Sequence, residues 1–242
     1  MLQALESAAF SAWPAQHSLD VQGWLLRLDR GYTRRANSAN ATAHARALTA
    51  NDVEAIEARF RLSGLTPTFR LTSFAPIEGS DRLLDSRGYR SCDASLVMTR
   101  SLAGFAEVAE TAFAPNAAAW VNAFGHASGK RGADQEIHLE ILRRIAAPCA
   151  WAVHSAVAPS LTCGLGVLVE DKLGLFDIAT RRDHQRRGLA RQLCEGLLAW
   201  GARRGAQTAF LQVVASNVPA IRLYEQLGFE TAYRYWYRVP NA

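Results

Sequence analysis

At 242 residues the chain is long enough to bury a substantial core, as one large domain or as two small ones. Hydrophobic residues make up 49% and charged residues 20%, a composition that excludes an intrinsically disordered chain. No apolar run approaches the roughly eighteen residues of a membrane-spanning helix. The net charge of +5 comes mainly from dispersed arginines without a long basic run, so nucleic acid is not expected. An anionic cofactor would use the charge equally well.

The amino-terminal segment and the cysteines bear on the cellular compartment. The first residues contain Glu6 and have no basic patch before an apolar stretch, so they lack the layout of a secretory signal peptide. Cys92, Cys149, Cys163 and Cys194 have neither C-x-x-C spacing nor paired histidines, which argues against a zinc site or a disulfide framework. We expect a soluble, reduced, cytoplasmic protein without a metal.

The first predicted strand is the apolar run Val21–Leu28, and the polar stretch Gly31–Asn40 that follows favours a loop between strands. An alternative is that Arg35, Asn37 and Asn40 line a pocket wall, because loops held by a sheet often carry binding groups.

The next elements alternate between helices and strands as far as residue 98. Asn51 is the predicted N-cap of a helix that Gly64 ends. The pattern then predicts a strand over Thr66–Thr72, a helix over Ile77–Ser86 and a strand over Tyr89–Met98.

Residues 99–112 form a junction, after which two helices and a run of strands are predicted. The helices cover Asn116–Phe124 and Asp134–Ile145, with a polar, glycine-rich turn over His126–Gly132 between them. Three strands follow at Ala150–His154, Leu161–Val169 and Leu173–Thr180, with turns at Pro159-Ser160 and at Glu170 to Lys172. Because the turns are short, the three strands should form an antiparallel meander.

The last third of the chain contains a strand, loop and helix that we take as its centre. The loop Gln185–Ala190 precedes an amphipathic helix over Leu189–Arg204, whose apolar face carries Leu193, Leu197, Leu198 and Trp200. After it come a parallel strand at Ala209–Val214 reached by a crossover, a helix at Val218–Leu227, and the final strands within Thr231–Val239.

The loop before this helix suits a phosphate group. The first N–H groups of a helix have no intrahelical partner, and the positive end of the helix dipole lies beside them. Gly188 and Ala190 leave the main chain open to an anion, while Arg186, Arg187 and Arg191 add positive charge. The loop is therefore a candidate pyrophosphate site.

Neither G-x-x-x-x-G-K-[ST] nor G-x-G-x-x-G occurs here, but the turn Gln185–Ala190 resembles the Q/R-x-x-G-x-G/A turn of the GNAT superfamily of acyl-CoA-dependent N-acyltransferases. The second half of the same signature is similar to the strand Ala209–Val214, then Ser216-Asn217, then the segment Ala220–Phe229. The resemblance therefore rests on two motifs in the expected order.

The resemblance implies a mixed α/β fold of two GNAT-like halves, each with a mixed, mainly antiparallel twisted sheet flanked by helices, and acetyl-CoA as co-substrate with no metal. It implies that backbone groups of Ile178, Ala179 and Thr180 pair with the pantetheine amides. It implies a pyrophosphate site at Gln185, Arg186, Arg187, Gly188, Leu189 and Ala190, with Arg191 beside it. Asn217 is expected to reach the cofactor or to act as a plain N-cap.

The chain also repeats itself. Gly64 precedes Phe69 by five residues, as Gly205 precedes Phe210, and Leu83–Tyr89 aligns with Leu223–Phe229. A period of this length predicts two related halves rather than a solenoid. We predict a degenerate GNAT-like domain at residues 1–100, which lacks the loop and has Leu84 in place of Tyr224, and a catalytic domain at residues 101–242.

Thioester aminolysis needs an acid for the leaving thiolate and a base for the amine. Tyr224 is the expected acid, since a phenol with a pKa near 10 can protonate a thiolate, and the family has a tyrosine near this helix position. A half-buried structural tyrosine is the alternative. For the base, Asp177, Glu136, His138, Glu140 and a water chain remain open, although Glu136, His138 and Glu140 would more often be solvated residues of a helix face.

The expected function is transfer of an acetyl group to a primary amine of a small molecule, such as an amino acid, an amine metabolite or an antibiotic. The alternatives are acetylation of a protein N-terminus or lysine, and a non-catalytic acyl-CoA sensor. The acceptor, the range of acyl groups and the oligomeric state, monomer or homodimer, are left open.

Overall fold

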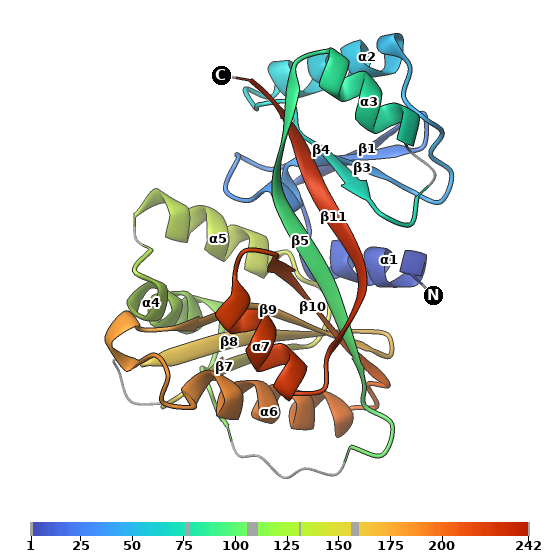
Figure 1. Cartoon of the computed structure of the whole chain (residues 1–242). Coiled ribbons are helices and arrows are strands. Elements are labelled where there is room, and N and C mark those ends of the chain that lie inside the picture. The colour runs from blue at the N-terminus through green and yellow to red at the C-terminus, as the bar shows by residue number, and fades with distance from the viewer. Residues whose placement is uncertain (1, 76–77, 106–110, 131, 156–159, 242) are drawn as a thin grey trace.

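The computed structural model describes residues 2–75, 78–105, 111–130, 132–155 and 160–241. Within these ranges eleven strands form one sheet in the order β1-β2-β3-β4-β11-β5-β10-β9-β8-β7-β6. Helices lie on its faces, so the mixed α/β class with a mainly antiparallel sheet is confirmed (Figure 1). The helices are α1 (Leu2–Ala12), α2 (Ala50–Leu62), α3 (Glu78–Ser86), α4 (Ala117–Ser128), α5 (Ala133–Arg143), α6 (Leu189–Ala202) and α7 (Val218–Gln226).

The strands follow the predicted ones in the second half of the chain more closely than in the first. They are β1 (His17–Val21), β2 (Trp24–Leu28), β3 (Ser38–Ala41), β4 (Phe69–Thr72), β5 (Tyr89–Ser101), β6 (Ala112–Phe113), β7 (Cys149–Val153), β8 (Thr162–Val169), β9 (Lys172–Thr180), β10 (Thr208–Val214) and β11 (Glu230–Pro240). The antiparallel meander β7-β8-β9 is confirmed, and so is the parallel pairing of β10 with β9. The turn predicted at Pro159 lies partly outside the described residues.

The single strand predicted over Val21–Leu28 is wrong, because a tight hairpin interrupts it. Gln22 and Gly23 have φ values of 55° and 81°, and positive φ at both central residues matches the right-handed twist of the paired strands. A Cβ at Gly23 would lie 2.6 Å from the carbonyl oxygen of His44. The turn therefore requires glycine at this position.

The N-cap predicted for α2 is also wrong. Thr49, not Asn51, caps the helix: its side chain accepts a hydrogen bond from the N–H of Asp52, and the Asp52 carboxylate accepts one from the N–H of Thr49. Gly64 follows the helix with φ of 66°, as expected of a helix end. The polar turn predicted from His126 begins later, because α4 continues to Ser128.

Helix α1 is held to the sheet by a buried ionic cluster. The carboxylate of Glu6 receives hydrogen bonds from Arg70 on β4 and from Tyr233 on β11, and Glu6 and Arg70 are 1% and 3% exposed. Burial disfavours the charge on Glu6, but Arg70 and Tyr233 outweigh it and hold the pKa of this carboxyl below its usual range. The cluster fixes α1 against β4 of the first half and β11 of the second half of the chain.

The predicted repeat corresponds to a repeat of elements. The series α2-β4-α3-β5 recurs as α6-β10-α7-β11, yet β11 lies between β4 and β5, and β5 pairs with β10. The last strand of each half therefore pairs with strands of the other half: β5 pairs with β10 and β11, and β11 pairs with β4 and β5. The long green and red strands that cross the centre of Figure 1 are this β5–β11 pair.

The second half of the sheet is covered on both faces. Leu193, Leu197, Leu198 and Trp200 of α6 are buried on one face together with Tyr224 of α7, which confirms the apolar face predicted for this helix. Helices α1, α4 and α5 cover the opposite face, where the core contains Trp13, Trp120, Phe124, Ile141, Phe176 and Phe210. We call the first the α6–α7 face and the second the α4–α5 face.

The described residues give three further findings. None of their helices is long and apolar enough to cross a membrane. Their His, Cys, Asp and Glu side chains form no group of three or more that could hold a metal ion. All four cysteines are free thiols.

Candidate functional site

Strands β9 and β10 part before they end. Their parallel pairing runs from Lys172 opposite Thr208 to Leu175 opposite Leu211, whereas β9 continues to Thr180 and β10 to Val214. Beyond this point the backbone of β9 pairs on its other side with β8. The edge of β9 that faces β10 is therefore open to a ligand.

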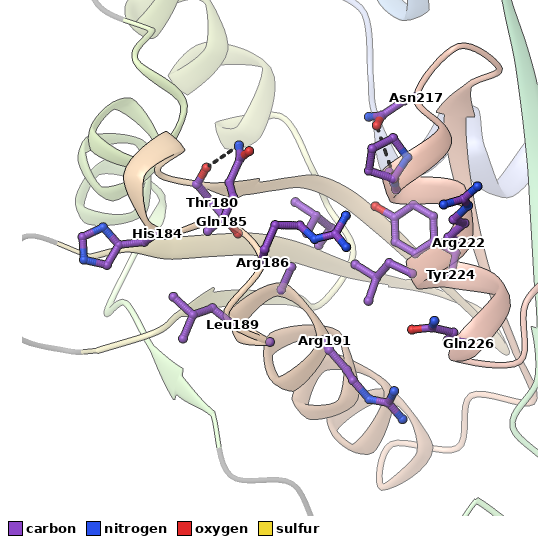
Figure 2. A pocket seen from close by; sticks show the side chains of 16 residues that line it. Thr180, His184, Gln185, Arg186, Leu189, Arg191, Asn217, Arg222, Tyr224 and Gln226 are labelled. Atoms are coloured by element: carbon purple, nitrogen blue, oxygen red, sulfur yellow. Dashed lines mark hydrogen bonds between the residues drawn. The ribbon is translucent and has the colours of Figure 1, made fainter.

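A cleft of about 580 Å³ lies on the α6–α7 face at this opening. Figure 2 shows its lining, which comes from the end of β9, the loop before α6, and α7. The predicted residues that line it are Ile178, Thr180, Gln185, Arg186, Gly188, Leu189, Ala190, Arg191, Asn217 and Tyr224. Ala179 and Arg187 do not line it: Ala179 packs against the core of the α4–α5 face, and the Arg187 guanidinium donates to the carbonyl of Asp183.

The loop at the mouth of α6 leaves main-chain donors free. Arg186 and Gly188 have φ values of 63° and 78°, and no side chain caps α6. The first bond of the helix runs from the N–H of Gln192 to the carbonyl of Gly188, so the preceding N–H groups have no such partner. A Cβ at Gly188 would meet nothing within 4 Å. An open cradle of this kind fits a diphosphate.

The charge around the cradle is positive. Arg186 and Arg222 are exposed, line the cleft and have no carboxylate partner among the described residues. Arg191 is paired with Glu195 at 2.8 Å. The Gln185 side chain donates to the carbonyl of Thr180 at 3.3 Å and holds the loop against the end of β9 (Figure 2).

Tyr224 and Asn217 reach the cleft from α7. The Tyr224 side chain is 8% exposed, and its hydroxyl points into the cleft (Figure 2) without a hydrogen-bond partner in the described part of the chain. Burial, and then the neighbouring Cys194, raise the pKa of Tyr224 above its ordinary value, so the phenol is protonated at neutral pH. Asn217 caps α7 by accepting from the N–H of Ala220 at 3.3 Å and also lines the cleft.

A bulge in β9 decides where Asp177 points. Leu165 of β8 lies opposite Phe176, whereas Cys163 lies opposite Ala179, so β9 holds one extra residue, and Asp177 has φ of 50°. Leu175 and Ile178 pack toward the α6–α7 face, and Phe176 and Asp177 both face α4 and α5. The direction that the sequence left open is toward the α4–α5 face.

Asp177 lies between a histidine and an arginine there. The Nε2 atom of His138 is 2.9 Å from Oδ2 of Asp177, although the angle falls outside good hydrogen-bond geometry, and Nη2 of Arg35 is 3.4 Å from Oδ1. Burial opposes ionisation of Asp177, but His138 and Arg35 outweigh it and lower the pKa of this carboxyl. Asp177 is therefore a carboxylate at neutral pH.

The other candidates for the base differ from one another. His138 was expected on a solvated face, and this is wrong: its side chain is fully buried. Its ring centroid lies 5.0 to 5.8 Å from those of four aromatic side chains, namely Trp13, Tyr32, Trp120 and Phe124. Glu136 and Glu140 are exposed as expected, and Glu140 forms an ion pair with Arg30. Among these residues, Asp177 lies on β9 beyond its last pair with β10, and His138 contacts it.

A second cleft of about 690 Å³ is lined by the loop before β3, by β5 and by β11. Arg35 and Asn37 line it, as the sequence suggested, and Asn37 also holds the loop by accepting from the N–H groups of Asp29 and Gly31. The prediction for Asn40 is wrong, because this side chain is buried and donates to the carbonyls of Leu25 and Ser38.

Sequence reasoning missed lining residues of both clefts. In the first cleft Ala220 lies four residues before Tyr224 and could have been found from helical spacing, whereas Arg222, Leu223 and Gln226 could not. In the second they are Arg34 and Arg90, which are distant in sequence and gave no signal. Only the strand order brings β5 near the loop before β3.

Comparison with known proteins gives a consistent family. The family model described as "Probable histone acetyltransferase Rv0428c C-terminal" matches residues 1–238. The chain is 27% identical to the "Uncharacterized N-acetyltransferase YobR" of Bacillus subtilis over 251 residues, which cover 99% of each chain. It also matches the [Ribosomal protein bS18]-alanine N-acetyltransferase of Escherichia coli K12, with 49% identity over 65 residues. This match covers 27% of this chain and 44% of that protein.

Solved structures share the fold. A GCN5-related N-acetyltransferase from Kribbella flavida superimposes with a TM-score of 0.71 at 14% identity, covering 99% of this chain and 95% of that one. A tandem GNAT protein from the clavulanic acid biosynthesis pathway gives a TM-score of 0.59 at 15% identity, covering 98% and 88%. At these identities the likeness concerns the fold alone.

Proposed function

The chain belongs to the Rv0428c C-terminal family and is a GNAT-type N-acetyltransferase, and we propose that it transfers the acetyl group of acetyl-CoA to a primary amine of a small molecule. The observation that carries the proposal is the cleft between β9 and α7. There an open helix N-terminus and a buried, protonated phenol line one cavity.

In this proposal the first cleft holds acetyl-CoA by its main chain. The N–H groups at the start of α6 bind the diphosphate, and Arg186 and Arg222 neutralise its charge. The backbone of Ile178 and Thr180, at the edge where β9 leaves β10, pairs with the pantetheine amides. The thioester then lies at the opening between the two strands, within reach of both faces of the sheet.

The transfer step uses one group from each face. The amine nitrogen of the acceptor forms a bond to the thioester carbonyl carbon, and the carbon–sulfur bond breaks. Tyr224 gives its proton to the departing thiolate from the α6–α7 face. The proton of the amine passes to Asp177, directly or through water, on the α4–α5 face. His138 and Arg35 position Asp177 for this role.

The amino-terminal half is proposed to be degenerate as a cofactor site. Helix α2 occupies the place in the repeat that α6 occupies in the second half, but Thr49 and Asp52 close its N-terminus. Arg46 pairs with the same carboxylate at 2.7 Å. An anion would have to displace Asp52, so one acetyl-CoA per chain is expected.

A second candidate function is acetylation of a protein α-amine. The 65-residue match to a ribosomal-protein alanine acetyltransferase favours it.

A non-catalytic acyl-CoA sensor would use the first cleft alone and would leave Asp177 without a role. The four free thiols are those of a protein in a reducing compartment, so a cytoplasmic location belongs to the proposal.

The test combines binding with turnover. Titration calorimetry should give one acetyl-CoA site per chain, and acetyl-CoA at about a hundred times its Kd should add about 2.7 kcal/mol to the free energy of unfolding. A panel of amines is then screened for thiol release. Absence of binding would refute the proposal, whereas binding without any acetylated amine would favour the sensor.

A further inference from the structure

Two residues that line the second cleft contact Asp177 or its neighbour His138. Arg35 lines this cleft and contacts the Asp177 carboxylate, and Tyr32 lines it and stacks on His138 with ring centroids 5.2 Å apart. Because the bulge turns Asp177 to the α4–α5 face, an amine in the second cleft approaches the thioester from the side opposite Tyr224.

The charge of this cleft is positive on balance. Four arginines line it, Arg30, Arg34, Arg35 and Arg90, against the carboxylate of Asp93. Three of the four have carboxylate neighbours: Arg30 pairs with Glu140, Arg34 with Asp93, and Arg35 with Asp177. Arg90 is exposed and has no carboxylate partner among the described residues. With every neighbouring carboxylate counted, one positive charge remains.

The ion pair of Arg34 is built into the strand. Ser95 lies opposite Tyr235 and Cys92 opposite Tyr237, so β5 departs from register at Asp93, which has φ of 49°. Asp93, which holds this strained backbone conformation, pairs with one guanidinium nitrogen of Arg34. The other N–H groups of Arg34 are left for a ligand. The Tyr237 ring, 6.0 Å from the Arg34 guanidinium carbon, further limits where that group can lie.

We propose that the acceptor is an amine that also carries a carboxylate, such as an amino acid or a short peptide with a free C-terminus, and that Arg34 and Arg90 bind this carboxylate. The inference rests on the proposed acetyltransferase function and narrows its substrate class. Arginine forks bind carboxylates in a bidentate manner, and Asp177 holds the amine at the other end. A lysine-rich protein tail would meet like charges in this cleft.

The experiment uses matched acceptors with the whole chain. Initial rates of thiol release are measured for α-amino acids and dipeptides, each paired with its C-terminal carboxamide, and for a lysine-rich peptide. The carboxamide is the less basic amine and has more of its neutral form at neutral pH, so a preference for the acid cannot come from amine basicity. We expect kcat/KM for the acid to exceed that for the carboxamide about tenfold or more.

Variants test whether Arg90 binds the carboxylate of the acceptor. In Arg90→Ala the KM for the acid should rise about tenfold, with the KM for acetyl-CoA and the rate with the carboxamide unchanged, and Arg90→Lys should recover part of the loss. Arg59→Ala, an exposed position of α2 outside both clefts, is the matched control. In a second readout without turnover, the acid should raise the melting temperature of the CoA-loaded wild type and of Arg59→Ala, but not of Arg90→Ala.

The outcomes separate the two proposals. Equal kcat/KM for acid and carboxamide, a preference for the lysine-rich peptide or for an aminoalkyl phosphate, or an acid preference that survives in Arg90→Ala overturns this inference. Each of these leaves acetyl transfer in place. If acetyl-CoA binds and no member of any pair is acetylated, the substrate class is wrong. If acetyl-CoA does not bind, both proposals fall.

Discussion

Tyr224 contributes a hydroxyl that has no hydrogen-bond partner among the described residues and lies in a cleft. Phenylalanine would fit the same space and leave no buried group unpaired, so Tyr224→Phe should fold normally. If the phenol protonates the thiolate, kcat should fall about a hundredfold, since general acids contribute factors of this order. Steady-state kinetics should show this loss with the KM for acetyl-CoA nearly unchanged.

Tyr89 provides the matched control, because its hydroxyl donates to Glu57 outside both clefts. Tyr89→Phe should lose a little stability and keep its full turnover. An unchanged kcat in Tyr224→Phe would remove the phenol from the mechanism.

Asp177 should couple stability to pH. Its pKa is lowered below the ordinary value of 3.8, so ionised Asp177 stabilises the fold above that value, and the stabilisation is lost as the pH falls through the lower folded pKa. The wild type should therefore exceed Asp177→Asn in stability at pH 7 and lose this advantage as the pH falls below about 4. Urea unfolding of both proteins across this range measures the difference. A difference that stays constant with pH would show that the charge of Asp177 is not responsible.

Asp177 and His138 show how much of the candidate site could be predicted from the sequence. The candidates Asp177 and His138 were identified by residue type, but neither direction nor burial could be predicted. Asp177 depends on one extra residue in β9, and a shift of one residue reverses the face of a strand side chain. His138 is buried in part by Trp13, which follows α1, and by Tyr32 of the loop before β3, both more than a hundred residues away.

At the level of elements, the backbone conformation of the loop before α6 should depend on Gly188. Gly188 and Gly205 share the left-handed backbone, with φ of 78° and 87°, and a Cβ would meet nothing within 4 Å at either position. Alanine at each should therefore cost a similar amount, about 1–2 kcal/mol of strain. Gly205 follows α6 and lies outside the cleft, so it is a matched control.

Calorimetry of the two variants separates strain from binding. Gly188→Ala should weaken acetyl-CoA binding about tenfold as the loop relaxes away from its native backbone, and Gly205→Ala should bind like the wild type. Equal affinity in both would mean that the loop conformation does not matter for the cofactor.

Elements with a strong local pattern were predicted well. Helix α6, the β7-β8-β9 meander and the crossover to β10 follow from periodicity and turns that lie within a few residues of each other. The hairpin at Gln22-Gly23 was missed because the mostly apolar run Val21–Leu28 was interpreted as one strand despite its glycine. The cap of α2 was misplaced because Asn51 is as good a cap by type as Thr49, and the Asp52 partner decides between them.

For the whole molecule, the shared sheet should make unfolding cooperative. Strands β5 and β11 pair along most of their length and join the two halves, whose boundary near residue 100 we propose from the repeat. Calorimetry should therefore show one transition. Leu84 in the first half and Leu198 in the second are fully buried. Alanine at either position should lower the free energy of unfolding by about 2–5 kcal/mol and shift this same transition to lower temperature. Two transitions that respond separately would indicate independent halves.

The repeat itself was visible in the sequence, but the exchange of strands was not. Leu83–Tyr89 and Leu223–Phe229 align by residue type, and the aligned helices do precede the paired strands β5 and β11. The local pattern of β5 and β11 does not identify their partners, because β5 pairs with strands more than a hundred residues later in the chain. The second cleft depends on this pairing, which is why its arginines could not be grouped in advance.

The position of β11 also sets an order for biosynthesis. Strands β4 and β5 are made early, yet the place between them is filled by a strand translated about 130 residues after β5, on the order of ten seconds later at ribosomal speed. Until then both strands have an unpaired edge that chaperones or neighbouring nascent chains can engage. Completion of the sheet accordingly waits for β11, and slowing translation upstream of β11 should prolong the exposure of these edges to aggregation.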